Sequence, residues 1–193
     1  MADRYANFAA LSQHERENFD YLIEVAARDS RVAVIAPHGG FIEPNTTPIA
    51  RRIAGNDLSF YSFTGLRPGR PHAHLHITSH RFDEPRCLDL VARSDIVITV
   101  HGMVGIDDPW LVYLGGLQTR LRERLRKSLT EAGFAARFDA QRYPGTHPSN
   151  ICNRGRSGRG VQLELPRHLR DRLAADSGLL GAFSAAIRAA IDG

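Results

Sequence analysis

The segment VAVIAPHGGFIE, residues 32–43, is an apolar run that leads to His38, two glycines and Glu43. The segment DIVITVHGM, residues 95–103, repeats the arrangement, with an apolar run that leads to His101 and a glycine. Short β-branched runs between turn residues are typical of buried strands. We therefore expect both histidines at strand ends, which is where α/β sheets place their ligands.

The rest of the chain alternates strand-like and helix-like segments. Leucines at 117, 121, 125 and 129 give one apolar stripe along a helix, and residues 66–73 and 144–160 have loop composition. This alternation predicts an α/β fold of three layers, α/β/α, in which helices cover both faces of a mixed, largely parallel sheet. We expect one domain over residues 1–193. Strands are expected at 20–27, 32–36, 58–63, 74–79, 96–100, 111–114, 134–138 and 161–165, and helices at 48–54, 85–93, 117–131, 167–175 and 179–191.

Composition excludes several classes of protein. The 193 residues are 42% hydrophobic and 24% charged, which is ordinary for a globular domain, and two cysteines are too few for a disulfide scaffold. The sequence shows no membrane-spanning stretch and no secretory signal, so we expect a cytoplasmic protein, released by lysis if at all. The net charge of +4 suits an anionic substrate, nucleic acid or an anionic surface and does not choose among them. It also leaves the oligomeric state open.

His38, Glu43 and His101 are candidate zinc ligands. Two histidines and a carboxylate form a catalytic zinc set that leaves the fourth position for water. The spacing of five between His38 and Glu43 does not fit one face of a helix, but it fits a strand end and a turn through Gly39 and Gly40. The alternative is that the histidines only cap or hydrogen-bond. Their equivalent positions, together with the carboxylate, favour a metal.

A metal-activated water needs a general base, and Glu164 is the candidate. It lies in the apolar run VQLEL, where a carboxylate is costly unless it is paired or used. The alternation of the run also permits a position on the solvent face.

Arginines and histidines in two other segments could bind substrate. The loop NICNRGRSGRG, residues 150–160, holds Asn153 and Arg154, and a guanidinium recognises carboxylates through forked hydrogen bonds. Arg156 and Arg159 of this loop fit solvated positions better. In HAHLHITSH, residues 72–80, alternation predicts three histidines on one strand face, and we take His74 as the candidate substrate contact.

Four motifs resemble the poly-γ-glutamate hydrolase family of bacteria and their phages. They are APHGGxIEPxT at 36–46, LHITSxxFDEP at 75–85, VHG at 100–102 and HPxNICNRGRSGxGVQLEL at 147–165. The resemblance extends over roughly residues 20–175 and implies a fold similar to that of the zinc carboxypeptidases.

The resemblance also implies roles for individual residues. His38, Glu43 and His101 match the ligands of one Zn²⁺, and Glu164 matches the general base. Asn153 and Arg154 resemble a pair that holds a substrate carboxylate, and Arg154 could alternatively stabilise the tetrahedral oxyanion. The substrate implied is poly-γ-glutamate or a γ-glutamyl peptide.

Two other functions are weighed against this one. The first is a zinc amidase that acts on γ-glutamyl bonds of peptidoglycan fragments. The second is a basic nucleic-acid-binding protein without catalysis, which would bind DNA or RNA with a steep dependence on salt.

Overall fold

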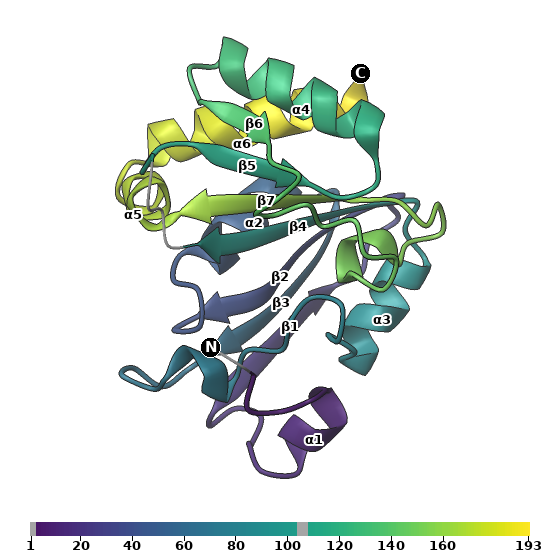
Figure 1. Cartoon of the computed structure of the whole chain (residues 1–193), viewed down its shortest axis with the longest axis vertical. Coiled ribbons are helices and arrows are strands. Elements are labelled where there is room, and N and C mark those ends of the chain that lie inside the picture. The colour runs from purple at the N-terminus through teal and green to yellow at the C-terminus, as the bar shows by residue number, and fades with distance from the viewer. Residues whose placement is uncertain (1–2, 104–107) are drawn as a thin grey trace.

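A seven-stranded sheet in the order β1-β3-β2-β4-β7-β5-β6 runs through the protein, whose computed structural model describes residues 3–103 and 108–193 (Figure 1). The neighbours β3, β2, β4 and β7 are parallel. At the two edges, β1 runs antiparallel to β3 and β5 runs antiparallel to β7, while β6 runs parallel to β5. The predicted mixed, largely parallel sheet is therefore confirmed. The strands are β1 (Tyr21–Ala26), β2 (Val32–Gly40), β3 (Ser59–Gly65), β4 (Ile96–Met103), β5 (Val112–Gly115), β6 (Ala136–Phe138) and β7 (Val161–Pro166).

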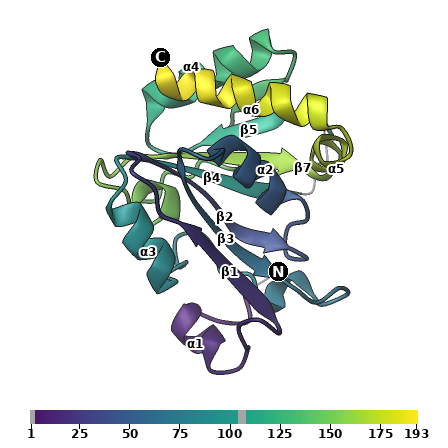
Figure 2. The ribbon, with the colours of Figure 1, turned by 180° about the vertical axis from the view of Figure 1, so that it is seen from behind.

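Helices cover both faces of this sheet. Figures 1 and 2 show α4 and α6 on one side and α1 and α3 on the other. A separate hydrophobic core lies on each face of the sheet. Val34 belongs to one core and Ile35 to the other, because successive side chains of a strand point to opposite faces. The apolar run of β2 thus has both faces buried. The helices are α1 (Phe8–Ser12), α2 (Thr46–Ala54), α3 (Pro85–Ala92), α4 (Thr119–Glu131), α5 (Arg167–Ala175) and α6 (Ser177–Asp192), with 3₁₀ turns η1 (His72–His74) and η2 (Ile151–Asn153).

Most of the expected elements occur within a few residues of their predicted bounds, with one clear exception. The strand predicted at 74–79 is wrong, because η1 and an irregular segment occupy that region. Pro71 begins a helical turn there, in which the His74 amide donates to the Pro71 carbonyl at 2.9 Å and the His76 amide donates to the His72 carbonyl at 3.2 Å. These backbone groups are therefore not free to pair with a strand.

Two further properties follow from the described residues. No single helix among them has the length and apolar character needed to cross a bilayer; α5 and α6 meet those criteria only as a pair, with a bend of 115° between them. Cys87 and Cys152 are free and buried.

The end of β2 departs from regular pairing where it carries His38. The register between β2 and β3 shifts between Ala36 and Gly39. Pro37 lies in this interval and has no N–H to donate, which is why proline within a sheet is confined to edges and bulges. Bulges re-aim side chains, and here the re-aimed side chain is that of His38.

The turn after His38 depends on glycine at position 40. Gly40 has φ 62°, and a Cβ on it would lie 2.2 Å from the carbonyl oxygen of Gly65. Gly69 has a similar φ of 73°, but nothing lies within 4 Å of the place where its Cβ would be. Substituting each glycine in turn therefore separates the free-energy cost of a positive φ, which both share, from the cost of the clash with Gly65, which only Gly40 has.

Gly40→Ala is expected to lower the free energy of unfolding by about 2–4 kcal/mol, because it adds a backbone clash to an unfavourable φ. Gly69→Ala, the matched control, is expected to lose about 1 kcal/mol, since only the φ is unfavourable. Equilibrium denaturation in urea measures both. Equal losses would show that the approach of Gly40 to Gly65 does not constrain the turn.

Candidate functional site

A cleft of about 810 Å³ opens at the carboxyl ends of β2, β4 and β7. Its walls come from these strand ends, from the turn after β2, from residues 72–79 and from the start of α5. This is the edge of the sheet at which the sequence places its candidate residues. The lining comprises His38, Ile42, Glu43, Pro44, His72, His76, Thr78, Ser79, His101, Gly102, Met103, Tyr143, Glu164, Arg167 and Arg170.

His38, Glu43 and His101 converge within this cleft. The Nδ1 atoms of the two histidines are 3.2 Å apart, and His38 Nδ1 is 3.0 Å from Glu43 Oε1. The second carboxylate oxygen, Oε2, lies 3.7 Å from His101 Nδ1 and accepts a hydrogen bond from the Gly102 amide at 2.7 Å. All three side chains are buried.

Hydrogen bonds on the outer side fix both imidazoles. His38 Nε2 lies 2.8 Å from the carbonyl oxygen of Ile77, and because a carbonyl only accepts, Nε2 carries the proton. His101 Nε2 lies 3.3 Å from the hydroxyl of Ser79, which can accept in the same way. Rings held in this way turn both Nδ1 atoms toward the Glu43 carboxylate. Metal-binding histidines are typically oriented by such outer bonds.

The converging atoms fit a tetrahedral cation. Three lone-pair atoms repel one another unless a positive charge lies between them. Zinc bonds of about 2.0–2.1 Å in tetrahedral geometry place neighbouring ligand atoms about 3.3 Å apart. The separation of 3.2 Å between the two Nδ1 atoms is close to that value, and Glu43 offers Oε1 at 3.0 Å from His38 Nδ1 and Oε2 at 3.7 Å from His101 Nδ1. The donor set therefore suits Zn²⁺, which in catalytic sites takes three protein ligands and a water.

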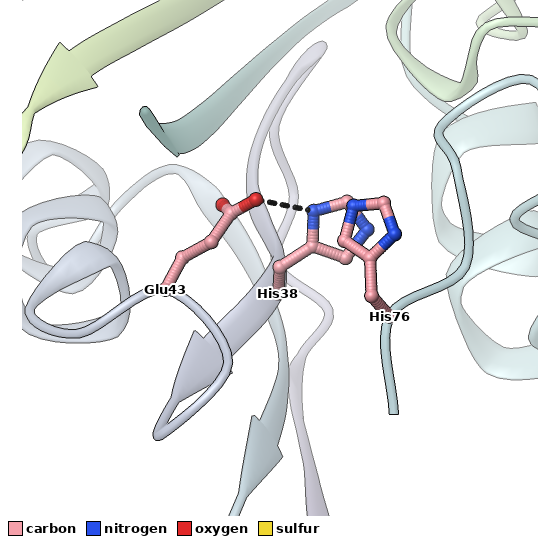
Figure 3. Close-up of side chains that lie close together, drawn as sticks. All are labelled: His38, Glu43 and His76. Atoms are coloured by element: carbon pink, nitrogen blue, oxygen red, sulfur yellow. Dashed lines mark hydrogen bonds and ion pairs between the residues drawn. The ribbon is translucent and has the colours of Figure 1, made fainter. Parts of the chain in front are cut away.

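His76 forms a second, looser group with two of these residues. Figure 3 shows the ring of His76 beside that of His38, which is hydrogen-bonded to Glu43. The centroids of the two imidazole rings are 4.1 Å apart. One ligand atom from each of His38, Glu43 and His76 lies within 4.8 Å of the others. His101 Nδ1 lies 3.2 Å from His38 Nδ1 and 3.7 Å from Glu43 Oε2, whereas His76 Nδ1 is held by Asp3, so we favour His101 as the third ligand. His76 lies against the site as part of its wall.

Asp3 holds this wall in place. Its carboxylate lies 2.6 Å from His76 Nδ1 and accepts from both the amide (2.8 Å) and the hydroxyl (2.6 Å) of Thr78. Burial would raise the pKa of Asp3, but the bonds from Thr78 and His76 lower it to about 2. Nothing in the sequence around Asp3 indicates this role, because its partners lie more than 70 residues away.

The histidine-rich segment does not present its side chains as predicted. The turn at η1 gives helical spacing, in which residues four apart share a side, so His72 and His76 line the cleft. His74, the predicted substrate contact, lines a separate hollow with Arg4 and Arg67. Histidines do alternate with apolar residues in this segment, but its backbone forms a helical turn and not a strand.

Glu164 lies beside His101, because these two residues pair in the register of β4 and β7. Its side chain lines the cleft and accepts a hydrogen bond from Gln162 Nε2 at 3.2 Å. Burial raises the pKa of Glu164, and Glu43 raises it further against the opposing charges of His101 and Arg170, so that it reaches about 7. A carboxylate that titrates near neutrality in a cleft can give and take protons.

Asn153 and Arg154 lie outside the cleft lining. The amide of Asn153 fastens the loop: its Nδ2 donates to the Gly145 and His147 carbonyls, and its Oδ1 accepts from the Leu117 and Gly160 amides. These four bonds use both N–H donors and both lone pairs of the Asn153 amide.

Arg154 is exposed and donates to the carbonyl of Phe82 at 3.3 Å. The next residue, Gly155, packs against Ser94 and Val97 at the amino end of β4, whereas His101 is toward the carboxyl end. Substrate binding by Asn153 and Arg154, inferred from their resemblance to a carboxypeptidase pair, therefore finds no support in their positions.

Arg170 is a cleft residue that the sequence did not indicate. It is buried, and its guanidinium donates to the carbonyls of Leu165 (3.0 Å), Met103 (3.4 Å) and Pro44. Arg170 lies between Leu169 and Asp171 in an arginine-rich stretch, and nothing in this stretch marks it as buried. Only the packing of α5 against the strand ends shows it.

Fold and site together define a class of protein. A three-layer α/β/α fold with two histidines and a carboxylate converging at strand ends, and a second carboxylate beside them, is typical of metal-dependent hydrolases. The model of the poly-gamma-glutamate hydrolase family matches residues 5–183. The chain therefore belongs to the poly-gamma-glutamate hydrolase family.

Comparisons with individual proteins agree with this assignment. The SPbeta prophage-derived UPF0714 protein YoqZ of Bacillus subtilis (strain 168) is 40% identical over 85% of this chain, which spans 59% of the length of YoqZ. A bacteriophage poly-gamma-glutamate hydrolase structure superposes with TM-score 0.90 at 32% identity, covering 99% of this chain and 97% of that one. The structure of YndL in a zinc-free apo form superposes with TM-score 0.89 at 30% identity, covering 99% of this chain and 98% of that one.

A more distant structure supports the expected type of fold. A protein of Burkholderia mallei ATCC 23344 assigned as a carboxypeptidase superposes with TM-score 0.52 at 15% identity, covering 89% of this chain and 59% of that chain. This likeness concerns the fold alone and agrees with a carboxypeptidase-like sheet.

Glu164→Gln is expected to stabilise the metal-free protein at pH 8 by about 1–3 kcal/mol, given about 1.4 kcal/mol per pKa unit. The folded pKa of about 7 is above the ordinary value of 4.5. Below pH 4.5 both states hold the proton. Between pH 4.5 and 7 only the folded state keeps it, so stability falls as pH rises, and above pH 7 the full penalty applies.

Denaturation in the presence of a chelator, at pH 4 and at pH 8, measures this effect. Glu131→Gln on the exposed side of α4 is the matched control, because its side chain is 65% exposed. A gain for Glu164→Gln of the same size at both pH values would contradict the raised pKa.

Proposed function

We propose that this protein is a zinc-dependent hydrolase that cleaves γ-glutamyl amide bonds, with poly-γ-glutamate as its substrate. The observation that carries the proposal is the convergence of His38, Glu43 and His101 beside Glu164 in one cleft. Membership of the family supports the substrate class. The existence of a form of YndL named as zinc-free supports the choice of metal.

His38, Glu43 and His101 would hold the metal through two Nδ1 atoms and the carboxylate. A zinc ion bound there supplies Lewis acidity toward the scissile carbonyl and lowers the pKa of water. Ile77 and Ser79 keep the two imidazoles in the ligating orientation through their Nε2 bonds. The cleft has room for a substrate segment next to the open position.

Glu164 moves the proton in the proposed reaction. It removes a proton from the attacking water as the new C–O bond forms at the scissile carbonyl carbon. It then passes this proton to the amide nitrogen, so that the C–N bond breaks with a neutral amine as leaving group. The raised pKa of Glu164 suits both roles, because the group must be a base in the first step and an acid in the second.

The charge of the protein suits an anionic polymer. Each residue of poly-γ-glutamate keeps a free carboxylate, and the chain carries a net charge of +4. Two guanidinium groups, Arg167 and Arg170, lie in the cleft lining itself.

Loss of the metal is expected to abolish cleavage. Dialysis against a chelator should stop the release of new amines from poly-γ-glutamate, and zinc should restore it. His38→Ala is expected to lose both bound zinc and activity, whereas Glu164→Gln should keep zinc and lose at least about 1,000-fold in kcat.

His14→Ala is the control, since His14 is exposed and stacks on Tyr5, outside the cleft lining. Elemental analysis, the amine assay and the size of the remaining polymer are the measurements. Peptidoglycan stem peptides and DNA serve as competing substrates or ligands. Full activity in chelator, or salt-dependent DNA binding without hydrolysis, would overturn the proposal.

A further inference from the structure

Two guanidinium groups line the cleft, and one of them is buried against backbone carbonyls. Arg170 is buried and donates to three backbone carbonyls, those of Leu165, Met103 and Pro44. These bonds tie the ends of β4 and β7 and the turn after β2 together, so the guanidinium of Arg170 supports the backbone of the cleft. Arg154, which the sequence suggested as the carboxylate anchor, lies elsewhere. The cleft therefore needs another cation if it is to hold a carboxylate.

Arg167 has its terminal nitrogens free. Its Nε donates to both carboxylate oxygens of Asp171, at 2.8 Å each, and Asp171 is in turn held by Asn45 Nδ2 at 2.8 Å. Within residues 3–103 and 108–193, no protein group bonds to Nη1 or Nη2 of Arg167. The side chain is 54% exposed, so a ligand in the cleft can reach it.

The surroundings of Arg167 favour an anion. Burial lowers the pKa of Arg170, and the nearby charge of Arg167 lowers it further, against the opposing effect of Glu43. The two guanidinium groups thus repel each other, while Glu43, Asp171 and Glu164 act on Arg170 in the opposite sense. A carboxylate entering from the cleft would reduce this repulsion and accept forked hydrogen bonds.

The position of Arg167 relative to Glu164 indicates which carboxylate it meets. Arg167 follows Glu164 by three residues, at the point where β7 passes into α5 (Figure 1). Glu164 delivers its proton to the departing amide nitrogen in the proposed reaction. In a γ-linked glutamate polymer, the carbon attached to that nitrogen also bears the free α-carboxylate. This α-carboxylate lies one carbon away from the departing nitrogen. It is therefore the substrate group that a side chain at the start of α5 can reach.

We propose that Arg167 is a specificity-determining residue, whose Nη1 and Nη2 bind the α-carboxylate on the leaving side of the scissile γ-amide. Asp171 and Asn45 hold the guanidinium in position through Nε. This inference rests on the proposed function and assigns the recognition of the carboxylate to a residue at the start of α5.

The test compares two γ-glutamyl oligomers, one with free α-carboxylates and one in which these are carboxamides. Arg167→Gln should raise KM for the acid form about 10- to 100-fold, with kcat within about threefold, because a charge-assisted fork is lost. Its KM for the carboxamide should stay close to that of the unchanged protein. Arg167→Lys should lie between, since it keeps the charge and loses the fork.

Arg172→Gln is the matched control, with the same change of charge on the same helix, at an exposed residue that lines a different hollow. It should behave like the unchanged protein on both oligomers. Thermal melting of each variant separates a folding defect from a binding defect, and Arg167→Lys provides the reading if Arg167→Gln does not fold.

The outcomes distinguish the two proposals. If the unchanged protein cleaves the acid oligomer and Arg167→Gln keeps its KM and its preference for the acid, only the role of Arg167 falls. If Arg167→Gln lowered kcat and left KM unchanged, that role would also be overturned. If the unchanged protein neither cleaves nor binds either oligomer, the proposed function fails and the role of Arg167 fails with it.

Discussion

The cleft depends on the buried guanidinium of Arg170, which joins three segments of backbone. Its acceptor carbonyls belong to Pro44, Met103 and Leu165, and each lies within two residues of a site side chain, namely Glu43, His101 and Glu164. A buried charge is tolerated only when hydrogen bonds satisfy it, so the three carbonyls and Arg170 require one another. Gly102 completes the contact, because a Cβ there would lie 2.5 Å from the guanidinium carbon.

This arrangement gives two carboxylates in one cleft opposite properties. Burial would raise the pKa of Glu43, but His38, His101 and His72 hold it well below its ordinary value. Burial raises the pKa of Glu164, which Glu43 reinforces. Environments that separate the pKa values of neighbouring groups allow one to remain an anion while the other exchanges a proton. One carboxylate is thereby suited to holding a cation and the other to acid–base work.

The sequence predicts what local periodicity determines and misses what packing determines. The runs ending at His38 and His101 define buried strands, and strand ends of a parallel sheet share one edge, so the grouping of these histidines with Glu43 was foreseeable. The placement of His74 was not, because HAHLHIT alternates as a strand does while backbone bonds after Pro71 impose a helical turn. The choice of arginine was equally hidden, since the sequence around Arg167 and Arg170 does not show which of them packs against the strand ends.

The bonds of Asp3 to His76 and Thr78 bring the first described residues of the chain against the wall of the cleft. The other end of the described chain lies at the end of α6, on the opposite side of the sheet (Figure 1). An affinity tag or fusion partner joined ahead of Asp3 would therefore emerge beside the cleft in which we propose that the polymer binds. Attachment after Gly193 keeps such an addition on the far side, which makes it the better choice for measuring polymer binding.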